Sequence, residues 1–251
     1  MAPAGVDGVV ALSWSGRTGA TLRAVQISLE AGLPVISLTS DGGSPIAQAS
    51  DHHVELPKHN VREAIPAIGY ALHAGLVHRL CDDEAATPAN LAALWRQAAP
   101  AVEQIAAECP HRPDAITVAS MPDARGAAEF WSLKLIEATG LSVRIPAIEE
   151  TGHVDYFIGP QDHLTVALSV APADRAVTLT DALRTNGHQA TVVTLDRLVG
   201  AQAPRSVREL VGGLLGADLA RTWAIAWHRP PFRGGAVDMS GSHIHTSGET
   251  R

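Results

Sequence analysis

The chain has 251 residues, of which 46% are hydrophobic and 18% charged, so it is long and apolar enough to bury a full core. Its formal net charge of −7 excludes the strongly basic surface that binding to nucleic acid or to an anionic membrane requires. There is no apolar N-terminal signal or long apolar run, and Cys81 and Cys109 lack metal-ligand spacing. These features predict a cytoplasmic protein with reduced thiols.

The first part of the chain alternates strands and helices. Apolar runs between turn residues predict three strands, at 8–13, 34–39 and 51–56. Apolar residues with the period of a helix predict one helix, at 18–31. Ser44 followed by Pro45 is typical of the start of another helix. This alternation indicates an α/β fold with a parallel sheet, in which ligands bind at the carboxyl ends of the strands.

Helices dominate the middle of the chain, and a second α/β region follows. The expected helices are 61–80, 90–108, 126–138, 174–186 and 206–227, and the expected strands are 115–119, 142–145, 164–170 and 190–195. We therefore expect four segments: a first half at 1–82, a helical connector at 83–113, a second half at 114–228 and a C-terminal tail at 229–251. The tail is rich in Gly, Pro, Ser and His, which predicts a surface strap or a partly disordered stretch.

A hydroxyl-rich turn lies where the first strand ends and the first helix begins. Ser13, Ser15 and Thr18 bring three hydroxyls to the free N–H groups and the positive dipole end of the helix, and Gly16 lets the backbone approach a ligand closely. This arrangement predicts a phosphate-binding loop. The alternative is that Ser15 or Thr18 only caps a surface helix.

Two charged residues interrupt the apolar helix at 126–138. At 100° per residue, Lys134 and Glu137 fall on the face shared with Phe130 and Leu133. Charges on such a face are costly unless they pair or face a cavity. The spacing therefore fits either a functional pair or an ordinary ion pair between residues i and i+3.

The first turn and its surroundings resemble the sugar isomerase (SIS) domain. The resemblance is carried by Ser13–Leu22, Gly32–Thr39 and Ser44–Ala47. It implies two SIS-type halves, each with a parallel sheet flanked by helices in three αβα layers, and a sugar phosphate bound by the hydroxyls of the turn. Arg17 stands where the family usually has Glu, Gln or Asn, which offers an extra phosphate contact or a different substrate. In the family, another strand and a loop precede the strand that leads into this motif. Only seven residues precede that strand here, so we expect a truncated first half.

A second resemblance concerns the residues of acid–base chemistry. The isomerase domain of glucosamine-6-phosphate synthases has a K-L-x-E run, and Lys134-Leu135-Ile136-Glu137 is similar to it. In these synthases and in bifunctional phosphoglucose/phosphomannose isomerases, a Glu-x-x-His run follows the glutamate after a fixed interval. Glu150-Thr151-Gly152-His153 lies at the same interval here. The resemblance implies that Glu137, with Lys134 beside it, moves the proton between C1 and C2 of the sugar. His153 would then assist ring opening, and Glu150 would contact the substrate. In the synthases this histidine reaches the neighbouring subunit, so a homodimer is implied.

Two further positions depart from these families. Arg62 matches only loosely the arginine of the Pro-Arg run that lies beside the substrate in the bifunctional isomerases. Both families also have a lysine near the C-terminus, whereas no lysine follows Lys134 here. Arg233 or His243 are the available replacements.

The sequence therefore supports three hypotheses. The first is an aldose–ketose isomerase that acts on a sugar phosphate through a cis-enediol, without metal or other cofactor. The second is a phosphosugar-binding module that regulates without turnover, and the third is a subunit completed by a partner chain. His243-Ile244-His245 is an isolated H-x-H pattern of the kind that usually binds no metal, and nucleotide-binding glycine motifs are absent.

Overall fold

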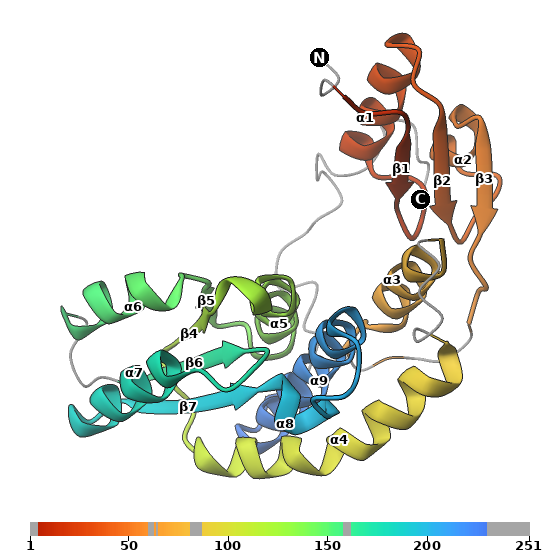
Figure 1. The fold of residues 1–251 in the computed structure, drawn as a ribbon. Helices are drawn as coiled ribbons and strands as arrows, with labels where there is room; N and C mark the ends of the chain where they lie inside the picture. The colour runs from red at the N-terminus through yellow and green to blue at the C-terminus, as the bar shows by residue number, and fades with distance from the viewer. Residues whose placement is uncertain (1–4, 60–62, 64, 81–86, 158–161, 230–251) are drawn as a thin grey trace. The chain divides into compact units, whose positions relative to one another are not determined.

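A computed structural model describes residues 5–59, 63, 65–80, 87–157 and 162–229 (Figure 1). The described residues divide into two compact units, the first ending before residue 63 and the second beginning at Glu63. This division differs from the expected segments, because the helix and the connector that follow residue 63 group with the second half. The expected tail lies outside the described residues from 230 onward. Among the described helices, none is long and apolar enough to cross a membrane.

The first unit is a three-stranded parallel sheet in the order β1-β2-β3. Its elements in chain order are β1 (Val9–Leu12), α1 (Gly19–Glu30), β2 (Val35–Thr39), α2 (Pro45–Ala49) and β3 (His52–Glu55). The helix α2 begins as expected, with Pro45 in the first turn and the Ser44 hydroxyl accepting a hydrogen bond from the Ala47 N–H. Ala11 and Val35 of the sheet pack on Val25 of α1 and Ile46 of α2, so both helices cover the same core.

The second unit contains a four-stranded parallel sheet in the order β5-β4-β6-β7. The strands are β4 (Ala115–Ser120), β5 (Ser142–Arg144), β6 (His163–Ser169) and β7 (Gln189–Thr194). The α-helices are α3 (Ile68–Leu80), α4 (Pro88–Glu108), α5 (Arg125–Thr139), α6 (Ile148–Val154), α7 (Asp174–Thr185), α8 (Leu195–Val199) and α9 (Arg205–Ala226). The short 3₁₀ helix η2 (Pro122–Ala124) precedes α5, and η3 (Asp155–Phe157) follows α6.

Alternation along β6 places helices on both faces of this sheet. Leu164, Val166 and Leu168 belong to the core shared with α4, α5, α8 and α9, whereas Ala167 belongs to the core shared with α6 and α7. The second unit therefore has the expected three αβα layers. The α/β fold with parallel sheets flanked by helices is confirmed.

Most predicted elements occur within a few residues of their expected bounds, but the helix predicted at 61–80 begins only at Ile68. Pro66 disfavours a helical conformation for the residue before it. A carboxylate oxygen of Glu63 accepts hydrogen bonds from the N–H groups of Ala67 and Ile68, at 2.6 and 2.7 Å, and so satisfies the first donors of α3. The helices α6 and α8 were not predicted.

Candidate functional site

The hydroxyl-rich loop joins β1 to α1 at the carboxyl end of the first sheet. Gly16 has φ +67°, and a Cβ atom there would overlap the Ser44 hydroxyl. The Gly16 carbonyl accepts a hydrogen bond of 3.1 Å from the Ile46 N–H, so the loop lies against the start of α2. Gly16 therefore packs closely on the start of α2, and its approach to a ligand stays a prediction.

The hydroxyls of this loop make hydrogen bonds within the loop rather than to the helix. Ser13 Oγ and Thr18 Oγ1 are 3.2 Å apart, and Ser15 Oγ accepts a hydrogen bond of 3.3 Å from the Arg17 N–H. Thr18 occupies the N-cap position of α1, yet its side chain makes no capping hydrogen bond. The alternative that Thr18 caps the helix is therefore not what the geometry shows. The first-turn N–H groups and the positive end of the dipole remain oriented toward the loop.

Arg17 adds a positive charge to the loop and already has an acidic neighbour. Its Nη2 atom lies 3.4 Å from Asp41 Oδ2, with both side chains more than a third exposed. Asp41 Oδ1 accepts a hydrogen bond of 3.0 Å from the Gly43 N–H. This bond first, and then the guanidinium of Arg17 and the charge of Lys58, lower the pKa of Asp41 against the opposing effect of burial. Asp41 is therefore ionised at neutral pH and competes with any bound anion for Arg17.

Other polar residues at this edge of the sheet were missed by the sequence analysis. Thr39, at the end of β2, donates to the Asp41 carbonyl at 2.9 Å, and its Oγ1 atom lies 3.0 Å from His53 Nε2. Ser44 lies against Gly16, and its hydroxyl is 3.5 Å from that of Thr39. The signal that could have found them is the parallel sheet itself, because the carboxyl ends of neighbouring strands lie at one edge.

The charged pair on α5 is largely buried. Lys134 Nζ lies 2.7 Å from Glu137 Oε2, and their side chains are 5% and 22% exposed. The ammonium is 5.2 Å from the centre of the Phe130 ring, whereas Leu133, expected on the same face, is half exposed. An ordinary surface ion pair would leave both side chains in solvent. Here only the carboxylate of Glu137 retains appreciable access to solvent.

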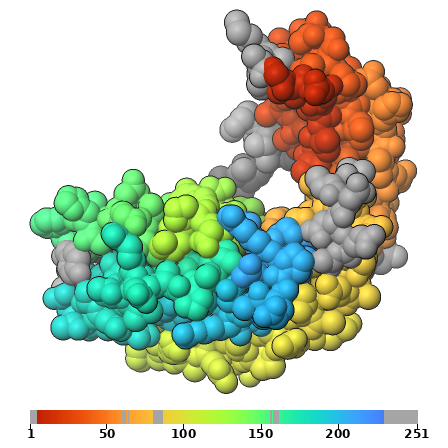
Figure 2. Space-filling model, in the orientation of Figure 1, coloured from red at the N-terminus to blue at the C-terminus, as the bar shows by residue number. Residues whose placement is uncertain are grey.

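Glu150 and His153 lie on α6, and both are exposed. Because α6 and α5 pack on opposite faces of the second sheet, the unit does not bring these residues together with Lys134 and Glu137 (Figure 1). Figure 2 shows the green α6 at the surface of the second unit. Arg62, Arg233 and His243 lie outside the described residues, as does His245.

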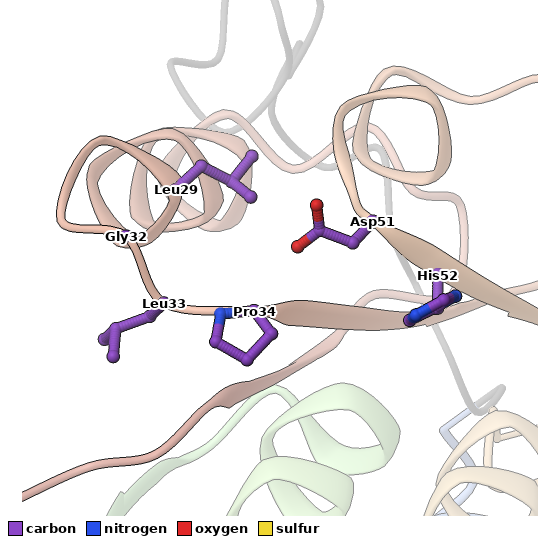
Figure 3. Close-up of a pocket in the computed structure, with 6 residues that line it drawn as sticks. All are labelled: Leu29, Gly32, Leu33, Pro34, Asp51 and His52. Carbon is purple, nitrogen blue, oxygen red and sulfur yellow. The ribbon is translucent and has the colours of Figure 1, made fainter.

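A hollow at the other end of the first sheet is a weaker candidate. It is lined by Leu29, Gly32, Leu33, Pro34, Asp51 and His52, which surround the amino ends of β2 and β3 (Figure 3). Asp51 uses Oδ2 to accept a hydrogen bond of 2.8 Å from the Val35 N–H, so its carboxylate joins the two strands. Parallel sheets bind ligands at the opposite, carboxyl edge. Within the described residues, no three His, Cys, Asp or Glu side chains gather as a metal site.

Comparison with known families supports the resemblance seen in the sequence. Residues 6–77, which include the whole hydroxyl-rich loop, match the family model of the SIS domain. This stretch of the chain therefore has the sequence pattern of an SIS domain. The matched range begins before β1 and continues into α3. No curated protein matches the chain.

Several solved structures share the fold over most of the chain. Glucosamine-6-phosphate deaminase from Thermotoga maritima is 15% identical with a TM-score of 0.74, and the match covers 94% of this chain and 76% of that one. Tagatose-6-phosphate ketose/aldose isomerase from Escherichia coli is 14% identical with a TM-score of 0.69, covering 96% and 72%. The C-terminal domain of glucosamine-fructose-6-phosphate aminotransferase from Francisella tularensis is 14% identical with a TM-score of 0.65, covering 88% and 71%. At these identities the likeness shows the fold alone.

Proposed function

We propose that the protein is an aldose–ketose isomerase that acts on a sugar phosphate of the hexose 6-phosphate type. The observation that carries the proposal is Glu137, a carboxylate held at 2.7 Å by a buried ammonium while its own side chain keeps 22% exposure. A fixed carboxylate with access to solvent is the group that removes a proton next to a carbonyl and then returns it. The SIS domain and the named neighbours support the substrate class.

The proposed reaction moves one proton between two carbons and one between two oxygens. Glu137 takes the proton from C2 of the open aldose as the C1–C2 double bond forms and the C1 oxygen becomes a hydroxyl. The resulting cis-enediol loses the proton of its C2 hydroxyl as that oxygen becomes the ketone, and Glu137 returns its own proton to C1. No oxidant, metal or cofactor is consumed in this sequence. Lys134 keeps the carboxylate in place through its hydrogen bond of 2.7 Å.

The hydroxyl-rich loop has the role of holding the phosphate in this proposal. Ser13, Ser15 and Thr18 supply neutral hydrogen-bond donors, and the first turn of α1 supplies backbone N–H groups and a positive dipole end. Arg17 adds a charged contact once it leaves Asp41. The remaining site residues, Arg62, Glu150 and His153, belong to the proposal through the family resemblance, and His153 belongs to it as a group contributed across a homodimer interface.

One observation favours a second candidate, a phosphosugar-binding module without turnover. Glu150 and His153 lie on the opposite face of the second sheet from Glu137, so a single second unit does not assemble the full acid–base set. In this candidate the loop binds the phosphate, and Lys134 and Glu137 are a structural pair. The two candidates predict the same ligand and differ in chemistry.

Incubation with sugar phosphates in deuterated water separates these candidates. Fructose-, glucose- and mannose-6-phosphate are each mixed with the protein, and deuterium at C1 and C2 is followed by NMR. The isomerase predicts deuterium incorporation that depends on protein concentration. A raised melting temperature with no incorporation from any of the three sugars would overturn the isomerase and favour the binding module.

A further inference from the structure

The ammonium of Lys134 has two partners, and one of them is aromatic. Besides Glu137, it faces the ring of Phe130 at 5.2 Å from the ring centre. The negative face of a ring attracts a cation, and the attraction is stronger when the cation is desolvated. Lys134 is 4% exposed, so its position depends on both neighbours.

The ring of Phe130 is itself held by a residue from another helix. Tyr70 of α3 stacks on Phe130 of α5 with ring centres 3.8 Å apart and planes 20° apart. The hydroxyl of Tyr70 lies beside Gly213 of α9, where an added Cβ would come within 3.0 Å of it. Three helices of the second unit thus fix one aromatic pair. Burial, assisted by the charge of Glu209, raises the pKa of Tyr70 to about 12, so the stack carries no charge at physiological pH.

We propose that Tyr70 and Phe130 are positioning residues for the acid–base pair, an inference that rests on the proposed function for its catalytic consequence. The stack is a rigid platform under Lys134, and the ammonium fixed on this platform orients the carboxylate of Glu137. Without the platform, the four-carbon stem of Lys134 regains rotational freedom, and Glu137 loses its orientation. Neither aromatic ring touches the proton in transfer.

The chain offers a direct readout of the platform, because Lys58 and Lys134 are its only lysines. In protein labelled with ¹³C and ¹⁵N at lysine, the side-chain methylene signals of Lys134 should be shifted upfield by the ring current of Phe130, and Lys58 is the internal reference. Phe130→Leu should abolish the upfield shift. Tyr70→Leu should reduce it although Phe130 is still present, and Tyr70→Phe should retain it because the stack survives.

Hydrogen exchange into the sugar phosphate then tests the catalytic consequence. Tyr70→Leu should lower the exchange rate at saturating sugar phosphate about tenfold or more, with the half-saturating concentration unchanged within about twofold. Tyr70→Phe should stay within about twofold of the parent in both. Should Tyr70→Leu fail to fold, Gly213→Ala displaces the Tyr70 hydroxyl while keeping its ring, and should lower both the upfield shift and the exchange rate in part.

Each outcome decides one claim. An unchanged Lys134 shift in folded Tyr70→Leu or Gly213→Ala protein would overturn the platform. A lost shift with an unchanged exchange rate would overturn the positioning role. A parent protein that shows the Lys134 shift but exchanges no hydrogen would instead overturn the proposed function, and the NMR comparison of the variants would still decide the platform.

Discussion

Replacement of Gly16 by alanine tests how tightly the phosphate loop is built. The residue has φ +67°, a conformation that costs an L-residue about 1 kcal/mol relative to glycine. The new methyl group would also overlap the hydroxyl of Ser44, which caps α2, and losing such a cap costs about 1 kcal/mol. We therefore expect Gly16→Ala to lower the local stability of the first unit by about 2 kcal/mol.

The matched control is Gly32→Ala. Gly32 has φ +75°, but nothing lies within 4 Å of its added Cβ, so only the backbone cost of about 1 kcal/mol applies. Amide hydrogen exchange over β1, β2 and β3 reads the first unit separately, which a single unfolding curve of a two-unit protein does not. Phosphosugar binding should weaken in Gly16→Ala and stay unchanged in Gly32→Ala. Equal loss of protection and equal binding in the two variants would refute the close packing of Gly16 on Ser44.

Three further predictions concern the loop and a buried histidine. Ser15→Ala and Thr18→Ala should each weaken phosphosugar binding by about 1–3 kcal/mol, measured by titration calorimetry. Hydrogen exchange should show that both variants keep the fold. Parent-like affinity in both would mean that the loop has only a structural role. Asp41→Asn keeps an acceptor for Gly43 and removes the ion pair with Arg17, so it should tighten phosphosugar binding about threefold at low salt. Weaker binding would contradict the competition. Burial lowers the pKa of His163 below its usual 6.5, so the unfolded chain binds the proton more readily. The free energy of unfolding should therefore fall as the pH drops below that value. In denaturant titrations His163→Gln should show a shallower fall than the parent, and an equal fall would mean that another group titrates.

The strands and long helices were predictable because their patterns are local. A strand with a sheet neighbour on each side and helices on both faces is buried throughout and reads as a mainly apolar run, and β6 is buried at every position. The helix α6 was missed because only Ile148 and Thr151 of its seven residues are buried, which gives too little apolar period to detect. The helix α8 has five residues and follows β7 directly, so its apolar residues read as a continuation of the strand.

The candidate site likewise contains residues that the sequence predicts and residues that only the tertiary structure brings together. Ser13, Ser15, Gly16 and Thr18 were found because they are contiguous in one loop. Asp41 and His53 follow or belong to other strands, and only the strand register, which places His53 beside Ser37, brings them to the same edge. The stack of Tyr70 on Phe130 joins residues 60 positions apart in sequence, and no periodicity within either helix predicts it. Contacts of this kind depend on tertiary packing.

The central claim is that Glu137 moves a proton on a bound sugar phosphate, and Glu137→Gln tests it most directly. Glutamine keeps the shape and a hydrogen-bond acceptor for Lys134 but does not serve as the base at neutral pH. Deuterium incorporation at C1 and C2 is measured for parent and variant, beside their affinities for the same sugar phosphate. The account predicts a loss of incorporation of at least about a hundredfold, with affinity retained within about tenfold. Incorporation by the variant within a few-fold of the parent would contradict it.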